Sequence, residues 1–238
     1  TNVGVDLGAA VSINEISNSA LALIEDSSVI SGGAVSVTAQ STADIDATAF
    51  GASLGIATSS GSGSSINVNA IVAVSINEIT NTTRAEFVDT DDSGGESIQV
   101  AGGVTLSASE SGTINANAVS ASADISIGSG SGANIGVDIQ AATATNDIAN
   151  TTRAGILGVD TTAGGSVDID AASHKAITSN VVSAGFAVDT SSGSGTNVGV
   201  TLMAAVGLNE ISNTNEALID DATVTSGGAV TLDAEETG

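Results

Sequence analysis

The sequence contains no cysteine, proline, tryptophan or tyrosine, and it has very few basic residues. Without cysteine it can form neither a disulfide framework nor a thiolate metal site. Three lysines and arginines stand against 27 aspartates and glutamates, which gives a formal charge of −24. A charge of this sign repels nucleic acid phosphates and anionic lipid headgroups, so cations are the natural small partners.

Long apolar runs are also missing. No stretch approaches the roughly 18 consecutive apolar residues of a membrane-spanning helix, and the chain does not begin with the charged and apolar regions of a secretory signal. We therefore expect no membrane span, and a chain start that is internal to something longer. The apolar content is nevertheless 41%. It is carried by small and β-branched side chains, which suit closely packed sheets and argue against disorder.

An internal repeat organises the whole chain. The segment at 13–18 (INEISN) returns at 76–81, 145–150 and 208–213, at spacings of 63, 69 and 63 residues. Gly-Gly pairs and Gly-Ser-Gly segments recur with the same spacings. One six-residue insertion, within an enlarged surface loop at 89–95, accounts for the single longer interval. The sequence thus predicts one repetitive domain with units 1–64, 65–132, 133–195 and 196–238, the last incomplete.

Within each unit the apolar residues alternate with polar or small ones, which is the period of a strand with one buried face. We expect inward columns of apolar side chains, such as Val5, Val68, Val137 and Val200. A second alternating stretch, 35–49, is too long for an ordinary strand. It either bends between two faces or forms one long flat strand, and the sequence leaves both open.

These patterns predict an all-β fold, a parallel β-solenoid (β-helix) of about 63-residue repeats with negligible helix. Equivalent strands of successive coils would stack about 4.8 Å apart. Each unit makes either one wide coil or three coils of about 21 residues. The three thirds of a unit do not resemble one another, which favours one wide coil.

The repeated Asn-Glu-Ile-x-Asn motif breaks the alternation, so we expect the chain to turn there. Stacked asparagines can bond to one another from coil to coil. The motif predicts two structural asparagine ladders: Asn14, Asn77, Asn146 and Asn209 in one, and Asn18, Asn81, Asn150 and Asn213 in the other.

Acidic residues recur at the same turns, in one column of Glu15, Glu78, Asp147 and Glu210 and a second that includes Asp26, Asp89 and Asp221. One interpretation is that they point into solvent and prevent edge-to-edge pairing of strands. The other is that calcium ions bridge these carboxylates and nearby turn carbonyls. A toxin-type calcium roll is disfavoured, because Ala34 and Val35 follow Gly33 where that pattern needs further glycine.

The sequence offers little for catalysis. His174 is the single histidine, and we expect it to be a surface residue beside Lys175, with Asp168 and Asp170 upstream on the same strand. Parallel β-helix enzymes that act on acidic sugars need basic residues, and Arg84, Arg153 and Lys175 are the whole supply. Arg153 and Glu216 occupy equivalent positions in adjacent units, which predicts an ion pair between coils.

Three segments together resemble the repeat regions of giant bacterial filamentous adhesins, the haemagglutinin-like and leukotoxin-like exoproteins: GGAVSVTA at 32–39, the Gly-Ser-Gly turn, and NVGV followed by INEISN. The resemblance covers the whole chain. It implies export to the bacterial cell surface or extracellular matrix, a β-solenoid shaft, and no active site.

We therefore expect a non-catalytic structural shaft of a secreted or cell-surface filament or adhesin. A glycan-binding or ice-binding module is the alternative, and a carbohydrate-active β-helix enzyme is less favoured. A solenoid without polar caps exposes unpaired strand edges. The expected partners are accordingly further coils, either in a longer chain or in copies joined end to end, with surface glycans as a further option.

Overall fold

The computed structural model describes residues 1–91 and 95–238, and the described residues form strands, turns and bends without a helix. Each repeat contributes four strands. The first coil has β1 (Asn2–Ile16), β2 (Ser19–Glu25), β3 (Val29–Ser31) and β4 (Val35–Ser60); the second has β5 (Ser65–Ile79), β6 (Thr82–Val88), β7 (Ser97–Val100) and β8 (Val104–Ser129); the third has β9 (Asn134–Ile148), β10 (Thr151–Leu157), β11 (Asp160–Ala163) and β12 (Val167–Ser191); the fourth has β13 (Asn197–Ile211), β14 (Thr214–Asp220), β15 (Val224–Ser226) and β16 (Val230–Thr237).

Equivalent strands of successive coils pair in parallel and form four sheets of four strands, named here after their first strand: the β1, β2, β3 and β4 sheets. In the β1 sheet Val5 lies opposite Val68, and Val68 lies opposite Val137. The predicted all-β parallel solenoid is confirmed, and each repeat makes one wide coil.

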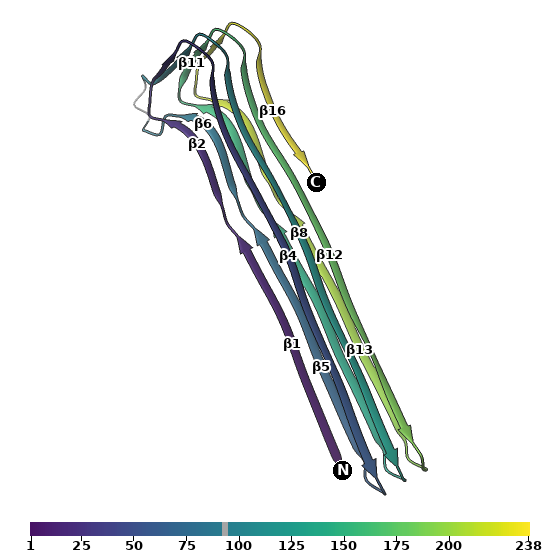
Figure 1. Ribbon diagram of the computed structural model, residues 1–238. Helices are drawn as coiled ribbons and strands as arrows, with labels where there is room; N and C mark the ends of the chain where they lie inside the picture. Colours follow the sequence, from purple (N-terminus) through teal and green to yellow (C-terminus); the bar gives the residue numbers. More distant parts are fainter. Residues whose placement is uncertain (92–94) are drawn as a thin grey trace.

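A coil is a long, flattened loop (Figure 1). β1 and β2 run in the same direction, the chain reverses around β3, and β4 returns along both of them. β4 and β8 are unbroken strands of 26 residues each, which corresponds to roughly 85 Å at about 3.3 Å per residue. The stretch that begins at Val35 is therefore one long strand and does not bend between faces.

The extra six residues lie between β6 and β7. Val88 of β6 pairs with Glu25 at a spacing of 63, whereas Ile98 of β7 pairs with Val29 at a spacing of 69. The predicted insertion at 89–95 falls in this interval, and its residues 92–94 lie outside the described residues. Both sheets keep their register on either side of it.

The expected turn at the Asn-Glu-Ile-x-Asn motif is wrong. β1 ends at Ile16 and β2 begins at Ser19, so the strand is interrupted for two residues but the chain keeps its direction. The motif breaks the alternation only if the apolar side of β1 faces inward. In the structure Ile16 packs into the core on the same side as Asn14, so the alternation continues through the motif.

The predicted inward columns are also wrong. Val5 and Val200 are 59% and 41% exposed, and Val68 and Val137 lie on the same outward side. The inward positions of β5 are instead Asn67, Asn69 and their alternate neighbours. The parity is preserved across coils, as expected, but the apolar side faces out.

Strand continuity explains this inversion. The half of the coil near β3 has an ordinary apolar core, and its parity carries through into the other half because side chains alternate strictly along an unbroken strand. In β4, Val37 and Ile45 point inward, so Gly51 and Gly55 must point inward too. The apolar core therefore ends partway along the coil, and a polar interior follows. Two clusters make up the apolar core: one around Phe87, Leu106 and Ile156, the other around Ile45, Ile79, Ile114 and Ile148.

Candidate functional site

The outward side of the β1 sheet is a continuous, almost entirely apolar surface, called here the apolar face. All of its positions are apolar except Thr143 and Thr145, and none is charged. Its members are Val3, Val5, Leu7, Ala9, Val11 and Ile13 of β1; Ile66, Val68, Ala70, Val72, Val74 and Ile76 of β5; Ile135, Val137, Ile139, Ala141, Thr143 and Thr145 of β9; and Val198, Val200, Leu202, Ala204, Val206 and Leu208 of β13.

An acidic row closes one end of the apolar face. Glu15, Glu78, Asp147 and Glu210 lie opposite one another at the last outward position of the four strands. Three of the four are exposed and Asp147 is half-buried. The sheet therefore changes from apolar to acidic within two residues, always at the same end of the strands.

The opposite side of the same half is apolar as well. The outward positions of the β4 sheet are mostly polar near β3. They are apolar from Phe50 to Ile56, from Val119 to Ile127 and from Val182 to Val188. Phe50 and Phe186, two of the three phenylalanines of the chain, lie here with 61% and 55% exposure. This half of the coil is thus apolar on both outer surfaces.

Between these surfaces lies a polar interior. The amide nitrogen Nδ2 of Asn67 donates to Oδ1 of Asp124 at 2.5 Å, across the gap between the β1 and β4 sheets. Nearby, the hydroxyl of Ser122 donates to Oδ1 of Asp138 at 2.9 Å and accepts from Nε2 of Gln140 at 2.6 Å. Asp124, Asp138 and Gln140 are all at most 2% exposed. Hydrogen bonds across the gap thus replace apolar packing in this half.

Glycines make room for these polar side chains. A Cβ atom at Gly55 would lie 2.5 Å from Nδ2 of Asn67, and one at Gly185 would lie 1.5 Å from Nε2 of Gln140. Any larger residue at these positions would displace the amide groups, so the polar interior depends on inward glycine in the facing strand.

Two interior carboxyl groups, those of Asp124 and Asp189, hold their protons more strongly than usual. Burial raises the pKa of Asp124. The hydrogen bond from Asn67 opposes this shift, and the charges of Asp138 and Asp189 add to it. Burial also raises the pKa of Asp189, against the effect of the Ser126 hydroxyl. Oδ2 of Asp124 and Oδ2 of Asp138 have no hydrogen-bond partner among the described residues.

Two asparagine columns run through all four coils. In the first, each Nδ2 donates to the Oδ1 of the next asparagine, from Asn14 to Asn77 at 2.8 Å, from Asn77 to Asn146 at 2.7 Å and from Asn146 to Asn209 at 2.8 Å. In the second, the bonds run from backbone N–H to side-chain Oδ1, joining Asn18, Asn81, Asn150 and Asn213 at 2.6–3.1 Å. Both columns link polar groups from coil to coil next to the apolar core, but in the second column Nδ2 of Asn81 and of Asn150 has no hydrogen-bond partner among the described residues.

The acidic residues near β3 are brought together only in part. Within the described ranges, the one group of three carboxylates whose oxygens all lie within 4.8 Å of one another is Asp26, Asp89 and Asp91. The carboxylate of Asp26 accepts from N–H and from Oγ1 of Thr90, both at 2.7 Å. Asp221 lies in the fourth coil, away from this group. Calcium binding at these residues, and at the acidic row, stays a prediction.

The basic residues are used in buried ion pairs. Glu86 is fully buried beneath Arg84 of its own strand and Arg153 of the next coil, and it pairs with both. The prediction that Arg153 pairs with Glu216 is wrong. The two residues lie opposite each other in the β2 sheet, but the side chain of Arg153 pairs with Glu86 of the preceding coil, which also pairs with Arg84. Lys175 pairs with Glu110 at 3.1 Å in the interior, and burial lowers the pKa of Lys175 against the opposing charge of Glu110.

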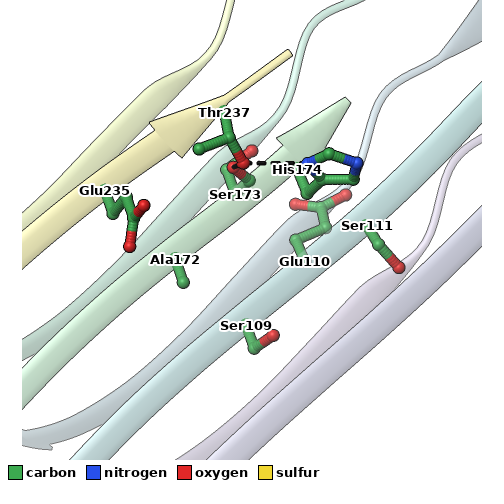
Figure 2. A pocket seen from close by; sticks show the side chains of 8 residues that line it. All are labelled: Ser109, Glu110, Ser111, Ala172, Ser173, His174, Glu235 and Thr237. Carbon is green, nitrogen blue, oxygen red and sulfur yellow. Dashed lines mark hydrogen bonds between the residues drawn. The ribbon is translucent and has the colours of Figure 1, made fainter. Parts of the chain in front are cut away.

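A small pocket lies beside the end of β16 (Figure 2), and it includes His174. His174 is exposed, as expected, and its Nδ1 is 2.8 Å from Oγ1 of Thr237. Glu110 also lines the pocket, but its oxygens are held by Lys175 and by the hydroxyl of Thr152. The pocket thus contains one histidine and two glutamates, Glu110 and Glu235, and of these His174 and Glu110 have structural partners.

The apolar face and the polar interior were missed from the sequence. A signal was present: the alternate positions of β5 and β9 carry Asn67, Asn69, Asp138 and Gln140, and facing positions of the β4 sheet carry glycine and serine. The half of the coil near β3 shows which alternate positions face inward. Continuing this alternation along the strands places these polar residues inside.

Comparison with known protein families, with curated proteins and with solved structures finds no match to this chain. None of the described residues forms a helix that is long and apolar enough to cross a bilayer.

Proposed function

We propose that this chain is a non-catalytic structural element, a shaft segment of a secreted or cell-surface filament or adhesin. The observation that carries the proposal is the continuity of bonding along the coil axis. In each coil the asparagine of the first column donates a hydrogen bond to the equivalent asparagine of the next coil. The backbone also pairs in unbroken parallel register through all four coils. A coil of the same kind would extend this pattern without any rearrangement.

The edges of the sheets favour the same function. β1 and β13 are the outer strands of the β1 sheet within this chain. Outer strands present backbone N–H and C=O groups that a matching strand can pair with. Further coils, whether in a longer chain or in a neighbouring copy, are the partners that fit such an edge, since repeats of this type contact only their neighbours along the axis.

The residues that catalysis would need are engaged elsewhere. His174 bonds Thr237, Glu110 is held by Lys175 and Thr152, and Arg84 and Arg153 share Glu86. These partnerships support a structural role for every basic residue of the chain.

Electron microscopy and fibre diffraction of native material test the proposal. We expect fibres whose axial repeat is about 4.8 Å, the spacing of stacked strands. If calcium bridges the acidic residues, a chelator will loosen the fibres; fibres that survive chelation remove the calcium component only. Compact particles with no axial repeat would contradict the shaft, and clear binding on a glycan array or in an ice-recrystallisation assay would favour the ligand-binding alternative.

A further inference from the structure

The apolar face is large for a surface left in water. It covers a four-stranded sheet over the residues from Val3 to Ile13 and their equivalents. At about 4.8 Å between strands and about 3.4 Å per residue, it measures roughly 700 Å². Monomeric proteins seldom expose apolar patches of more than a few hundred Å². A stable interface buries about 800 Å² on each partner, so the apolar face alone is close to the size of one.

From this geometry we infer that the apolar face binds the apolar face of a second copy of the chain, with the strands of the two copies antiparallel. This contact is lateral, at right angles to the coil axis, and is therefore distinct from the end-to-end stacking of coils proposed above. It holds whether or not coils also stack along the axis.

A second copy fits the face better than a lipid bilayer does. The formal charge of −24 repels anionic headgroups, and the acidic row borders the face along one end of its four strands. Another sheet of the same kind presents a surface with the same strand spacing and no charge. Sheets of this type pack face to face about 10 Å apart.

The acidic row decides the orientation. If the strands of the two copies were parallel, Glu15, Glu78, Asp147 and Glu210 of one copy would meet the same four carboxylates of the other. Antiparallel strands place the two rows at opposite ends, each opposite the uncharged outward positions at the strand beginnings, Val3, Ile66, Ile135 and Val198. A two-fold axis parallel to the coil axis produces this arrangement and keeps each coil opposite its equivalent.

A charge at the centre of the face tests the contact. Val72 and Ile139 lie on the two inner strands of the sheet with 43% and 44% exposure. The matched control is Ser107→Glu, which adds the same charge to an inner strand of the β4 sheet, on its polar outer surface. We expect the wild-type chain and the control to sediment as dimers or larger assemblies, and Val72→Glu to weaken self-association at least 100-fold. Ile139→Glu repeats the test if Val72→Glu lacks the strand signal in circular dichroism.

Raising the salt concentration should strengthen the wild-type association, because it screens the repulsion between two strongly acidic copies. A wild-type chain that stays monomeric at millimolar concentration would overturn the inference. So would self-association as strong in both substituted chains as in the wild type, because end-to-end stacking alone is unaffected by these substitutions. A wild-type chain that stays monomeric and instead binds phosphatidylcholine vesicles through Val72 would also overturn it.

Spin labels test the orientation. The chain has no cysteine, so Thr80→Cys, exposed just beyond the acidic row, gives one label per copy. Antiparallel strands would hold the two labels roughly 60 Å apart, whereas parallel strands would hold them about 10 Å apart. A short distance overturns the antiparallel arrangement. Failure of the shaft proposal would leave the lateral contact and the label distance unchanged, because the contact does not depend on axial stacking. Conversely, fibres that lack the lateral contact would still show the axial repeat.

Discussion

Neutralising a single carboxylate of the polar interior should stabilise the protein. Asp124 is 1% exposed, accepts one hydrogen bond from Asn67, and has a second oxygen without a hydrogen-bond partner among the described residues. The substitution Asp124→Asn keeps the shape of the side chain and the acceptor for Asn67. It replaces the second oxygen with a donor beside the carboxylates of Asp138 and Asp189, whose charges raise the Asp124 pKa.

The expected gain in the free energy of unfolding is about 1–3 kcal/mol, the cost of a buried polar group that lacks a partner. The sign of its dependence on pH follows from the pKa of Asp124. The native pKa of Asp124 lies above the ordinary value of 3.8, so the native state binds more protons than the unfolded state between these two values. Wild-type stability therefore falls as pH rises through this window, and the loss is complete above the native pKa. Asn cannot ionise, so the variant lacks this loss.

Urea unfolding followed by circular dichroism measures the effect. With about 3 kcal/mol per molar urea for a chain of this size, Asp124→Asn should raise the midpoint by about 0.3–1 M at pH 7.5, and by much less at pH 3. The control is Asp170→Asn on the exposed side of β12, which should change the midpoint little at either pH. A midpoint that falls at pH 7.5, or a gain that is the same at pH 3, would refute the reasoning.

Three further substitutions test other parts of the fold by the same unfolding assay. Phe87→Ala should cost about 3–5 kcal/mol because its ring is fully buried in the apolar core, whereas Phe50→Ala, on the outer surface, should cost under about 1 kcal/mol; equal losses would contradict the assigned burial. Asn77→Ala should cost about 1–3 kcal/mol, since it interrupts a ladder bond on either side, and exposed Asn115→Ala should cost far less. Glu86→Gln should destabilise by about 2–3 kcal/mol by leaving two arginines with a neutral partner, and an unchanged midpoint would show that the pairs contribute nothing.

The repeat spacing was enough to predict the architecture. Pairing in a parallel solenoid joins equivalent positions, so the spacing of 63 and 69 residues between copies of the motif is also the register of the sheets. The place of the insertion followed from the same count. The strand pairing and the place of the insertion both follow from the spacing of the repeated segments, which can be counted in the sequence.

The direction of the side chains could not be obtained from local alternation alone. Alternation separates two sides of a strand, and the more apolar side is usually the buried one. In β5 that rule fails, because the strand shares its parity with β6, where Phe87 and Ala85 must be buried. The ion pairs of Glu86 were missed for a similar reason: Arg153 has acidic neighbours in both adjacent coils, Glu86 and Glu216, and only the packing of the side chains selects between them.

The six extra residues between β6 and β7 show where the gene of such a protein can change in length. Val88 and Ile98 both keep their partners in the first coil despite the added segment. Residues added at this corner therefore do not change the register of the sheets. The corner lies at the β3 end of the coil, opposite the turns at Gly61 and Gly130. A foreign epitope or affinity tag inserted at the equivalent corner of any coil would be displayed at that end, and a chain of many coils would carry such inserts as a regularly spaced row.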